Sequence, residues 1–312
     1  METPPPNETD SLPGIGPQVS GLVSRREALL TLAAGATLPL LGARAVAETS
    51  APPAALRALP FKLGVASYTL RGMPLENALQ AVRRVGLDSI SVNRAHLPWE
   101  NLAPDWPAQL AKFTQAGVKP GCAGVFTVKD DEAEMRRAFD YIKGMGVPVF
   151  SCNPTPDALP RLERFVREYD VLAAIHNHGP ENKAWPSPHE PWRAIQSLDS
   201  RIGLCIDVGH TYRAGADPVQ CIRDYRARVY DIHLKDTAVP VGTKKDEPLE
   251  VGRGNLDIRG ILQALIDTGF SHSVWFEYEK SPDDVLPGLA ESVGYVRGLL
   301  RGMGFTAAPR AS

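Results

Sequence analysis

The sequence has little of several features that would point to common functions. Its 312 residues carry a formal net charge of only −2, so it lacks the basic excess typical of proteins that bind nucleic acid or anionic membranes. No apolar run reaches the roughly 18 residues that a membrane span requires. No G-x-G-x-x-G opens the first expected helix, and no glycine-rich loop is placed to cradle a phosphate. These absences argue against nucleic acid as a partner and against a doubly wound dinucleotide-binding sheet.

The first 47 residues are typical of an export signal. A polar Pro/Gly-rich stretch, expected to be disordered, precedes Arg25-Arg26, an apolar segment over residues 28–42, and an A-x-A site that ends at Ala47. The paired arginines resemble the twin-arginine (Tat) type of signal; a short buried or amphipathic helix is the alternative. We expect cleavage after Ala47, a periplasmic location without membrane attachment, a linker over 48–60, and a cofactor acquired before export.

Cysteine is scarce, with four residues at spacings that match no zinc motif. An exported protein meets an oxidising compartment, where disulfides form. Cys205 shares strand parity with Asp207 and is expected to face the core. We therefore predict free, buried thiols, with a Cys122–Cys152 bridge as the alternative.

From Phe61 onward, strand-like and helix-like patterns alternate. The expected strands cover 61–70, 89–95, 119–128, 147–152, 171–178, 202–209, 229–235 and 272–279. The expected helices cover 74–86, 108–117, 132–145, 158–170, 188–199, 217–228, 256–268 and 284–302. Such alternation predicts βαβ units and a parallel sheet. Eight units in this length fit an α/β fold with one (β/α)₈ (TIM) barrel over 61–303, followed by a tail over 304–312.

The four late strands all end in side chains that can bind metal. In such barrels the active site lies at the carboxyl ends of the strands. The side chains are His176 and His178 after strand five, Asp207 and His210 after strand six, His233 and Lys235 after strand seven, and Glu277 and Glu279 after strand eight. Because alternate strand residues face the same side, these strands aim His, Asp, His and Glu at one volume. Buried charges need partners, and a divalent cation would supply one.

Taken singly, these residues have simpler explanations. His96, at the end of strand two, is either a structural histidine or a substrate contact. Asp207 alone could cap the next turn, Lys235 could be solvated, and Glu279 is expected in a salt bridge at the rim. A metal site is favoured because four consecutive strands all end in side chains that can bind metal.

The segments "CIDVGH", "DIHLKD", "GRGNLDI" and "WFEYE" resemble the xylose isomerase-like TIM barrel superfamily, the sugar phosphate isomerase/epimerase group. The resemblance covers roughly residues 61–303. It implies one divalent ion held by a Glu on strand five, an Asp on strand six, a His on strand seven and a Glu on strand eight. The last three carry over to Asp207, His233 and Glu277.

The strand-five ligand departs from the family pattern. Many members read "ENHG" where this chain has "HNHG", so that His176 stands at the glutamate position. His176 itself, His178 or Glu181 could complete the set, and we favour His176. A site with two histidines suits manganese best, with zinc, cobalt or iron as alternatives, because magnesium prefers oxygen ligands.

The family chemistry implies proton abstraction next to a carbonyl. We expect the catalytic residues to be Glu277, His176, Lys235 and His210. The residues expected to bind substrate are His96, Tyr68, Arg94, Asn153 and Arg253. With one carboxylate base in place of two, an aldose–ketose shift or an elimination is favoured over two-base epimerisation.

The predicted function is that of a metal-dependent isomerase or epimerase-like enzyme on a carbohydrate, non-phosphorylated because of the export signal. One alternative is a lyase or dehydratase acting on a 3-keto-glycoside or an inositol-type substrate. A second is a sugar-binding barrel without catalysis, suggested by the missing glutamate. A metal-dependent endonuclease shares this barrel, but the near-neutral charge argues against it. No nucleic acid partner is expected, and association into a homo-oligomer is left open.

Overall fold

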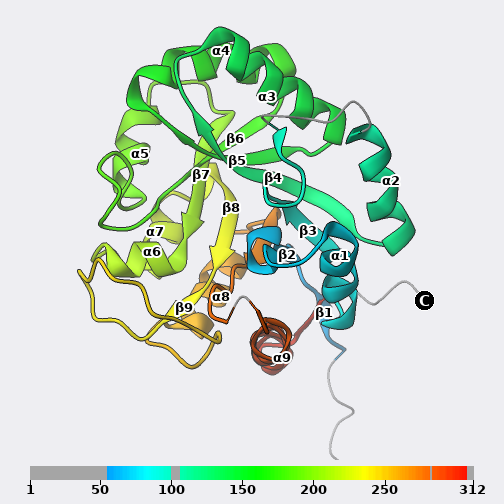
Figure 1. Ribbon diagram of the computed structural model, residues 1–312. Coiled ribbons are helices and arrows are strands. Elements are labelled where there is room, and N and C mark those ends of the chain that lie inside the picture. Colours follow the sequence, from blue (N-terminus) through cyan, green and yellow to red (C-terminus); the bar gives the residue numbers. More distant parts are fainter. Residues whose placement is uncertain (1–54, 100–105, 282, 308–312) are drawn as a thin grey trace, which may run out of the picture. The chain divides into compact units, whose positions relative to one another are not determined.

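Eight parallel strands form a closed barrel in the order β11-β2-β3-β4-β5-β6-β7-β8. The computed structural model describes residues 55–99, 106–281 and 283–307. Helices surround the barrel (Figure 1). The predicted (β/α)₈ fold is confirmed, whereas the expected signal peptide lies outside the described residues and stays a prediction.

The elements follow the order expected from the sequence. The barrel strands are β2 (Lys62–Ala66), β3 (Ser89–Val92), β4 (Lys119–Val128), β5 (Val149–Pro154), β6 (Leu172–His176), β7 (Ile202–Asp207), β8 (Val229–Leu234) and β11 (Ser273–Phe276). The α-helices are α1 (Leu75–Arg84), α2 (Trp106–Ala116), α3 (Glu132–Met145), α4 (Leu159–Tyr169), α5 (His189–Ile195), α6 (Val208–Arg213), α7 (Pro218–Asp224), α8 (Ile258–Asp267) and α9 (Leu286–Gly302). Short 3₁₀ helices are η2 (Ser67–Leu70), η4 (Pro156–Ala158) and η5 (Arg226–Arg228).

Some of the helix ends carry capping groups that set their bounds. Asp131 caps α3 by accepting a 2.8 Å hydrogen bond from the Glu134 amide, and Gly146 ends the helix in the left-handed region with φ +67°. Asp217 caps α7 and Pro218 occupies its first turn, as the sequence predicts. Local sequence thus sets the start of α3 and α7, whereas α1, α4, α5 and α9 begin without a side-chain hydrogen bond at the N-cap.

Several predicted strands are shorter than expected, and in two of them a helix takes the place of the expected strand end. The strand expected over 61–70 ends at Ala66, and η2 follows it. The strand expected over 202–209 ends at Asp207, because this residue caps the unpredicted helix α6. A one-turn helix therefore begins directly at the carboxyl end of β7, where the site lies.

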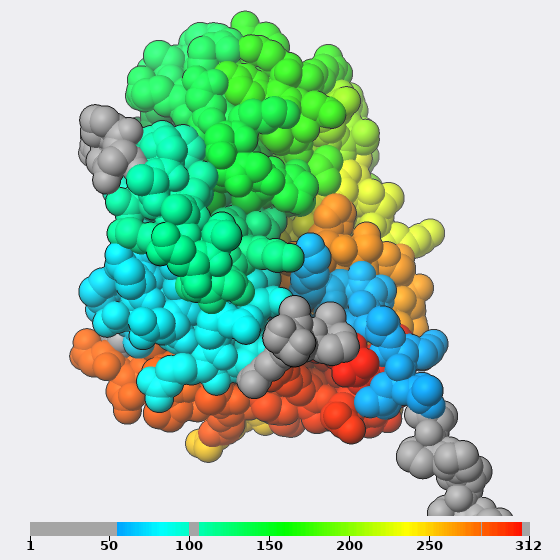
Figure 2. Space-filling model, turned by 90° about the vertical axis from the view of Figure 1, so that its right-hand side faces the viewer, coloured from blue at the N-terminus to red at the C-terminus, as the bar shows by residue number. Residues whose placement is uncertain are grey.

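The segments predicted as linker and tail pair with each other. β1 (Arg57–Ala58) runs parallel to β12 (Phe305–Thr306), and Figure 2 shows the first described residues, in blue, lying beside the red C-terminal ones. The Arg57 guanidinium also lies 4.1 Å above the Phe305 ring centroid. This short pair joins the two ends of the barrel domain. The remaining strands, β9 (Asp236–Thr237) and β10 (Pro248–Leu249), form an antiparallel pair within the long loop after β8.

A tryptophan fills the inside of the barrel below the site. Trp275 is fully buried, and its indole nitrogen donates a 2.5 Å hydrogen bond to Asp231. A Cβ at Gly64 or Gly121 would lie 2.2 Å and 2.7 Å, respectively, from ring atoms of Trp275. The small residues on β2 and β4 thus make room for the ring, which closes the barrel floor beneath the candidate ligands.

The cysteine prediction is confirmed, since all four thiols are free and buried. Burial raises the pKa of the Cys152 thiol above its usual value. Within the described part of the chain, no helix is both long enough and apolar enough to cross a membrane.

Candidate metal centre and active site

Four buried side chains meet at the carboxyl ends of neighbouring strands. His176 ends β6, Asp207 ends β7, His233 lies near the end of β8, and Glu277 directly follows β11. One ligand atom from each lies within 4.8 Å of the ligand atoms of the others. The strand register explains this meeting, because Asp207 is paired with His233 and His176 with Cys205.

Several polar atoms of this cluster have no hydrogen-bond partner among the described residues. They are both ring nitrogens of His176 and Nε2 of His233. Asp207 Oδ2 also accepts no hydrogen bond, but the Lys235 ammonium lies 3.1 Å from it. A buried polar atom without a partner costs about 1–3 kcal/mol. Imidazole nitrogens without partners that converge with the carboxylates of Asp207 and Glu277 fit a divalent transition ion. The residues present therefore suit a metal ion; that they bind one stays a prediction.

Asn177 holds the ends of β6 and β7 together. Its side-chain oxygen accepts a 3.0 Å hydrogen bond from the Asp207 amide, and its side-chain nitrogen donates to Thr211 Oγ1 at 3.1 Å. Asp207 Oδ1 accepts from the His210 amide at 2.8 Å as the cap of α6. The second oxygen, Oδ2, is thereby left to face the cluster. The asparagine in "HNHG" thus has a structural role in orienting the aspartate.

Burial and charge set the protonation of the cluster. Burial lowers the pKa of His176 to about 4, so that its ring is neutral at pH 7 and offers a lone pair. Burial alone would also lower the pKa of His233, but the Glu277 carboxylate 3.0 Å away outweighs it and raises that pKa to about 9. Burial would raise the pKa of Asp207, but His210 and Lys235 hold it well below its usual value. The carboxylates are therefore ionised, as a metal site requires, and His233 would release a proton when its imidazole binds a metal ion.

Lys235 places a buried ammonium group among the carboxylates. Its Nζ lies 3.1 Å from Asp207 Oδ2, 2.9 Å from Glu277 Oε2 and 3.1 Å from Glu279 Oε1. These carboxylates raise the pKa of Lys235 well above its usual value against the opposing effect of burial. The stem passes over Gly209, where a Cβ would lie 2.5 Å from Lys235 Cγ. The glycine of "DVGH" therefore makes the path by which this lysine enters the site.

A second network joins helix α6 to the two longest loops. The Arg213 guanidinium is buried, pairs with Glu181 at 2.8 Å and with Asp246 at 3.3 Å, and donates to His210 Nδ1 at 2.8 Å. It also donates to the Lys244 carbonyl. Since a guanidinium only donates, Nδ1 of His210 is the acceptor and Nε2 carries the proton in the neutral ring. This rim network fixes the loops over the site and the tautomer of His210.

These groups open into a pocket of about 470 Å³. The lining residues from β2–β5, and from the segments that follow these strands, are uncharged. The lining residues from the later half of the barrel include all of the pocket's histidines and charged side chains. The uncharged lining residues are Tyr68, Asn93, Val125, Thr127 and Asn153. The others are His176, His178, Glu181, His210, Arg213, Lys244, Asp246, Glu277 and Glu279. A polar, uncharged ligand would find hydrogen-bonding groups on one side and the reactive groups on the other.

The three alternatives for the strand-five ligand occupy different places. His176 belongs to the four-residue cluster. His178 is exposed, and its ring centroid lies 5.6 Å from that of His176 and 4.7 Å from that of His210. Glu181 pairs with Arg213 instead. The geometry therefore favours His176, while His178 and Glu181 line the pocket outside the cluster.

Only two of the five residues expected to bind substrate line the pocket. Tyr68 and Asn153 line the pocket, but Arg94, His96 and Arg253 are not among its lining residues. His96 is half-buried, and burial lowers the pKa of its ring although backbone groups of Met73 and Leu70 act to raise it. The Arg253 side chain is largely exposed and pairs with Glu291 at 2.8 Å. Substrate roles for these three residues stay predictions without support from the geometry.

Sequence reasoning missed two groups of the site. Arg213 and Asp246 were not singled out, whereas Glu279 was expected in a salt bridge and forms one with Lys235. Glu279 lines the pocket and contacts the buried Lys235. The signal for Arg213 was its position three residues after His210 in a helix, where the two side chains share a face. Asp246 lies in an irregular loop and left no such signal.

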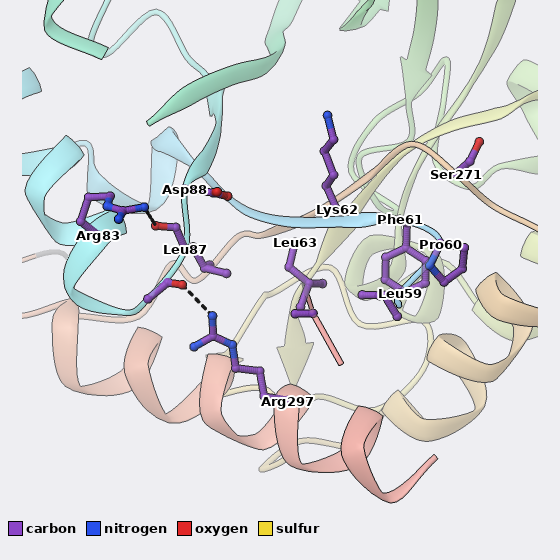
Figure 3. A pocket seen from close by; sticks show the side chains of 12 residues that line it. Leu59, Pro60, Phe61, Lys62, Leu63, Arg83, Leu87, Asp88, Ser271 and Arg297 are labelled. Carbon is purple, nitrogen blue, oxygen red and sulfur yellow. Dashed lines mark hydrogen bonds between the residues drawn. The ribbon is translucent and has the colours of Figure 1, made fainter. Parts of the chain in front are cut away.

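A second hollow lies at the amino-terminal ends of the strands, and it carries none of the clustered ligands. Its volume is about 300 Å³, and Lys62, Asp88, Ser271 and the arginines 83 and 297 are among its lining residues. Both arginines donate to backbone carbonyls near the end of α1, as Figure 3 shows. This end of a barrel serves stability rather than catalysis.

Comparison with known proteins agrees with this fold. A sequence profile described as xylose isomerase-like TIM barrel matches residues 79–299. A solved zinc-containing protein, IOLI, superimposes with a TM-score of 0.65 at 18% identity, over 78% of this chain and 99% of its own. At that identity the likeness shows the fold alone.

Two curated relatives match shorter segments. A "probable endonuclease 4" of Mesomycoplasma hyopneumoniae is 31% identical over 87 residues, which cover 25% of this chain and 32% of the relative. An "inosose dehydratase" of Geobacillus thermodenitrificans is 24% identical over 153 residues, which cover 45% of this chain and 49% of the relative. The chain thus matches less than half the length of either relative.

Proposed function

We propose that this chain, which belongs to the xylose isomerase-like TIM barrel family, is a divalent-metal-dependent isomerase that removes a proton next to a carbonyl of a carbohydrate. The observation that carries the proposal is the buried cluster with orphaned ligand atoms at the base of a 470 Å³ pocket. A purely structural cluster would satisfy its own polar atoms.

His176, Asp207, His233 and Glu277 would hold the metal ion. Two imidazoles and two carboxylates suit manganese, zinc, cobalt or iron, and manganese is favoured because half of the donors are oxygen. When bound, the ion would supply Lewis acidity that stabilises negative charge developing next to the carbonyl.

The protein's own groups supply proton transfer and hydrogen bonds. Glu277 is ionised, lines the pocket and is our candidate base. His210 lines the pocket, and its protonated Nε2 would donate to a substrate oxygen. The expected catalytic role of Lys235 stays a prediction, because its ammonium is paired with three carboxylates and it does not line the pocket. Tyr68 and Asn153, on the uncharged side, would bind the remaining hydroxyl groups.

The exchange of a carboxylate for His176 bears on the reaction. Inversion of a carbon needs a base on each face, whereas an aldose–ketose shift needs proton transfer on one face only. Of the two carboxylates in the cluster, Asp207 caps α6 and does not line the pocket, whereas Glu277 lines it and is left as the carboxylate base. This supports an isomerase over a two-carboxylate epimerase.

Elimination is the second candidate reaction. A dehydratase also needs one base, which removes the proton next to the carbonyl while a hydroxyl or glycosidic oxygen leaves the neighbouring carbon with a proton. The segment shared with an inosose dehydratase favours this candidate.

We also propose that the substrate carries no phosphate and meets the enzyme in the periplasm. The buried cations of the site, Arg213 and Lys235, are already paired with carboxylates. Phosphate binding is usually built from unpaired donors or a helix N-terminus. The twin-arginine-type segment at Arg25-Arg26 supports the location.

A panel of aldoses, ketoses and keto-glycosides in deuterated water tests the function. An isomerase would incorporate deuterium at one carbon with retained configuration, and a dehydratase would release water or the glycosidic alcohol. Efficient C3 epimerisation of a free ketose would contradict a mechanism with a single base. Loss of activity when the metal is removed would show that the reaction depends on metal.

A further inference from the structure

Lys235 and the candidate metal ion would share the same oxygen atoms. Asp207 uses Oδ1 to cap α6, so Oδ2 is the oxygen that is left for a metal. Lys235 Nζ lies 3.1 Å from that same Oδ2 and 2.9 Å from Glu277 Oε2. Both carboxylates belong to the ligand cluster. Two cations on one carboxylate oxygen repel each other strongly where water is excluded.

Glu279 gives this ammonium group a partner outside the cluster. Its Oε1 lies 3.1 Å from Lys235 Nζ, and it is not one of the four clustered ligands. The Glu279 side chain is 24% exposed, compared with 3% for Lys235, so the carboxylate lies on the pocket side of the lysine. If the flexible end of Lys235 moves toward Glu279, it keeps its ion pair with Glu279 and gives up its pairs with Asp207 and Glu277.

We propose that Lys235 acts as an internal counter-cation that holds Asp207 and Glu277 together before metal binds, and that Glu279 is a positioning residue that receives the ammonium group when the metal ion takes those two carboxylates. The inference rests on the proposed metal site. It explains why Lys235 is buried beside a set of four ligands that is complete without it, although its side chain fits there only because residue 209 is a glycine. It also explains why an acid that binds no metal lines the pocket next to it.

The test is the affinity for Mn²⁺ and for Zn²⁺ alone, measured by competition with a chromogenic chelator at fixed pH and ionic strength. The proteins are the wild type, Glu279→Gln, Lys235→Met and the double variant. Glu279→Gln is expected to weaken metal binding by between roughly 5-fold and 150-fold, the usual range of coupling between two sites. Lys235→Met is expected to strengthen it, and Glu279→Gln should have little further effect in that background. Glu168→Gln and Lys112→Met, which alter ion pairs on the outer helices, are the matched controls and should leave affinity unchanged.

A second measurement also covers the case in which Lys235→Met folds poorly without metal. Thermal unfolding should show that Lys235→Met lowers the melting temperature of the metal-free protein and enlarges the rise caused by added Mn²⁺. If this variant does not fold without metal, refolding it with Mn²⁺ should restore the fold. The affinity test then rests on comparing the metal affinity of Glu279→Gln with that of the control Glu168→Gln.

The outcomes separate this inference from the proposed function. Equal weakening by Glu279→Gln with and without Lys235, or weaker binding in Lys235→Met, would overturn the counter-cation while leaving the metal site. A wild-type protein that takes up neither ion would overturn the metal-dependent function, and the inference with it.

Discussion

The Arg213 guanidinium donates a 2.8 Å hydrogen bond to Nδ1 of His210, one turn before it on the same short helix. This contact determines which ring nitrogen of His210 carries the proton. Both residues lie on the short helix α6, which is capped by the candidate metal ligand Asp207. The same guanidinium ties down the loop that follows β8, because the Gly242 amide donates to the Arg213 carbonyl and the side chain pairs with Asp246. One arginine therefore couples the geometry of the site to the order of its rim.

Arg213→Met should loosen that rim without emptying the metal site. We expect faster tryptic cleavage at Lys244 and Lys245 and a roughly 10-fold to 100-fold lower turnover, the usual loss when a group that orients a catalytic residue is removed. Limited proteolysis needs no substrate and measures the first effect directly. Arg223→Met, which alters an exposed pair with Asp267, is the control; equal cleavage rates in the two variants would count against the role of Arg213.

His176→Glu should change which metal ions bind. A carboxylate in place of imidazole makes the donor set three-quarters oxygen, so relative affinity should move from zinc toward manganese and magnesium. Competition titrations with the three ions measure this. His178→Ala, which alters an exposed neighbour outside the cluster, should keep the wild-type preference; a change there of the same size would mean that His178 is the ligand.

Asp236→Asn should destabilise the loop that carries "GRGN". The Asp236 carboxylate accepts hydrogen bonds from the amides of residues 237, 252, 254 and 256 at 2.9–3.2 Å. Because the asparagine nitrogen cannot accept, we expect a loss of about 2–4 kcal/mol in the free energy of unfolding. Urea unfolding measures this loss for Asp236→Asn and for the control Asp224→Asn on the exposed face of α7. If the two variants differ by less than about 0.5 kcal/mol in the free energy of unfolding, Asp236 does not stabilise this loop.

Glu250 should contribute acid sensitivity to the fold. It is buried, and although burial opposes it, the Tyr278 hydroxyl at 2.8 Å and the Lys280 ammonium at 3.1 Å lower the pKa of Glu250 to about 2. A folded-state pKa below the unfolded value gives stability that is present above pH 4.5 and is lost as the pH falls toward 2. The difference in unfolding free energy between wild type and Glu250→Gln should therefore shrink over that window, by an amount on the order of 2 kcal/mol. A difference that stays constant from pH 6 to pH 2.5 would show that Glu250 has no such role.

Much of this architecture follows from strand and helix periodicity. The eight barrel strands and the positions of His176, Asp207, His233 and Glu277 at their ends could be predicted, because parity alone puts these side chains on the barrel interior. Helix α6 was not predicted as a helix because so short a segment has no periodic signal, but the alternative that Asp207 caps the next turn is confirmed. Arg253 was expected at the pocket, but Asp236 holds the amides of Gly252 and Gly254 and leaves the arginine between them to pair with Glu291. Such loop contacts depend on partners far along the chain, which local patterns do not reveal.

The most direct test of the central claim is metal analysis of protein purified from a periplasmic fraction, for the wild type, His176→Ala and Glu277→Ala. The account predicts about one transition-metal ion per chain in the wild type, and loss of that ion in both variants while the far-ultraviolet circular dichroism stays unchanged. Wild-type protein that contains no metal, and takes up none when manganese or zinc is added, would contradict the account and favour a sugar-binding barrel without catalysis.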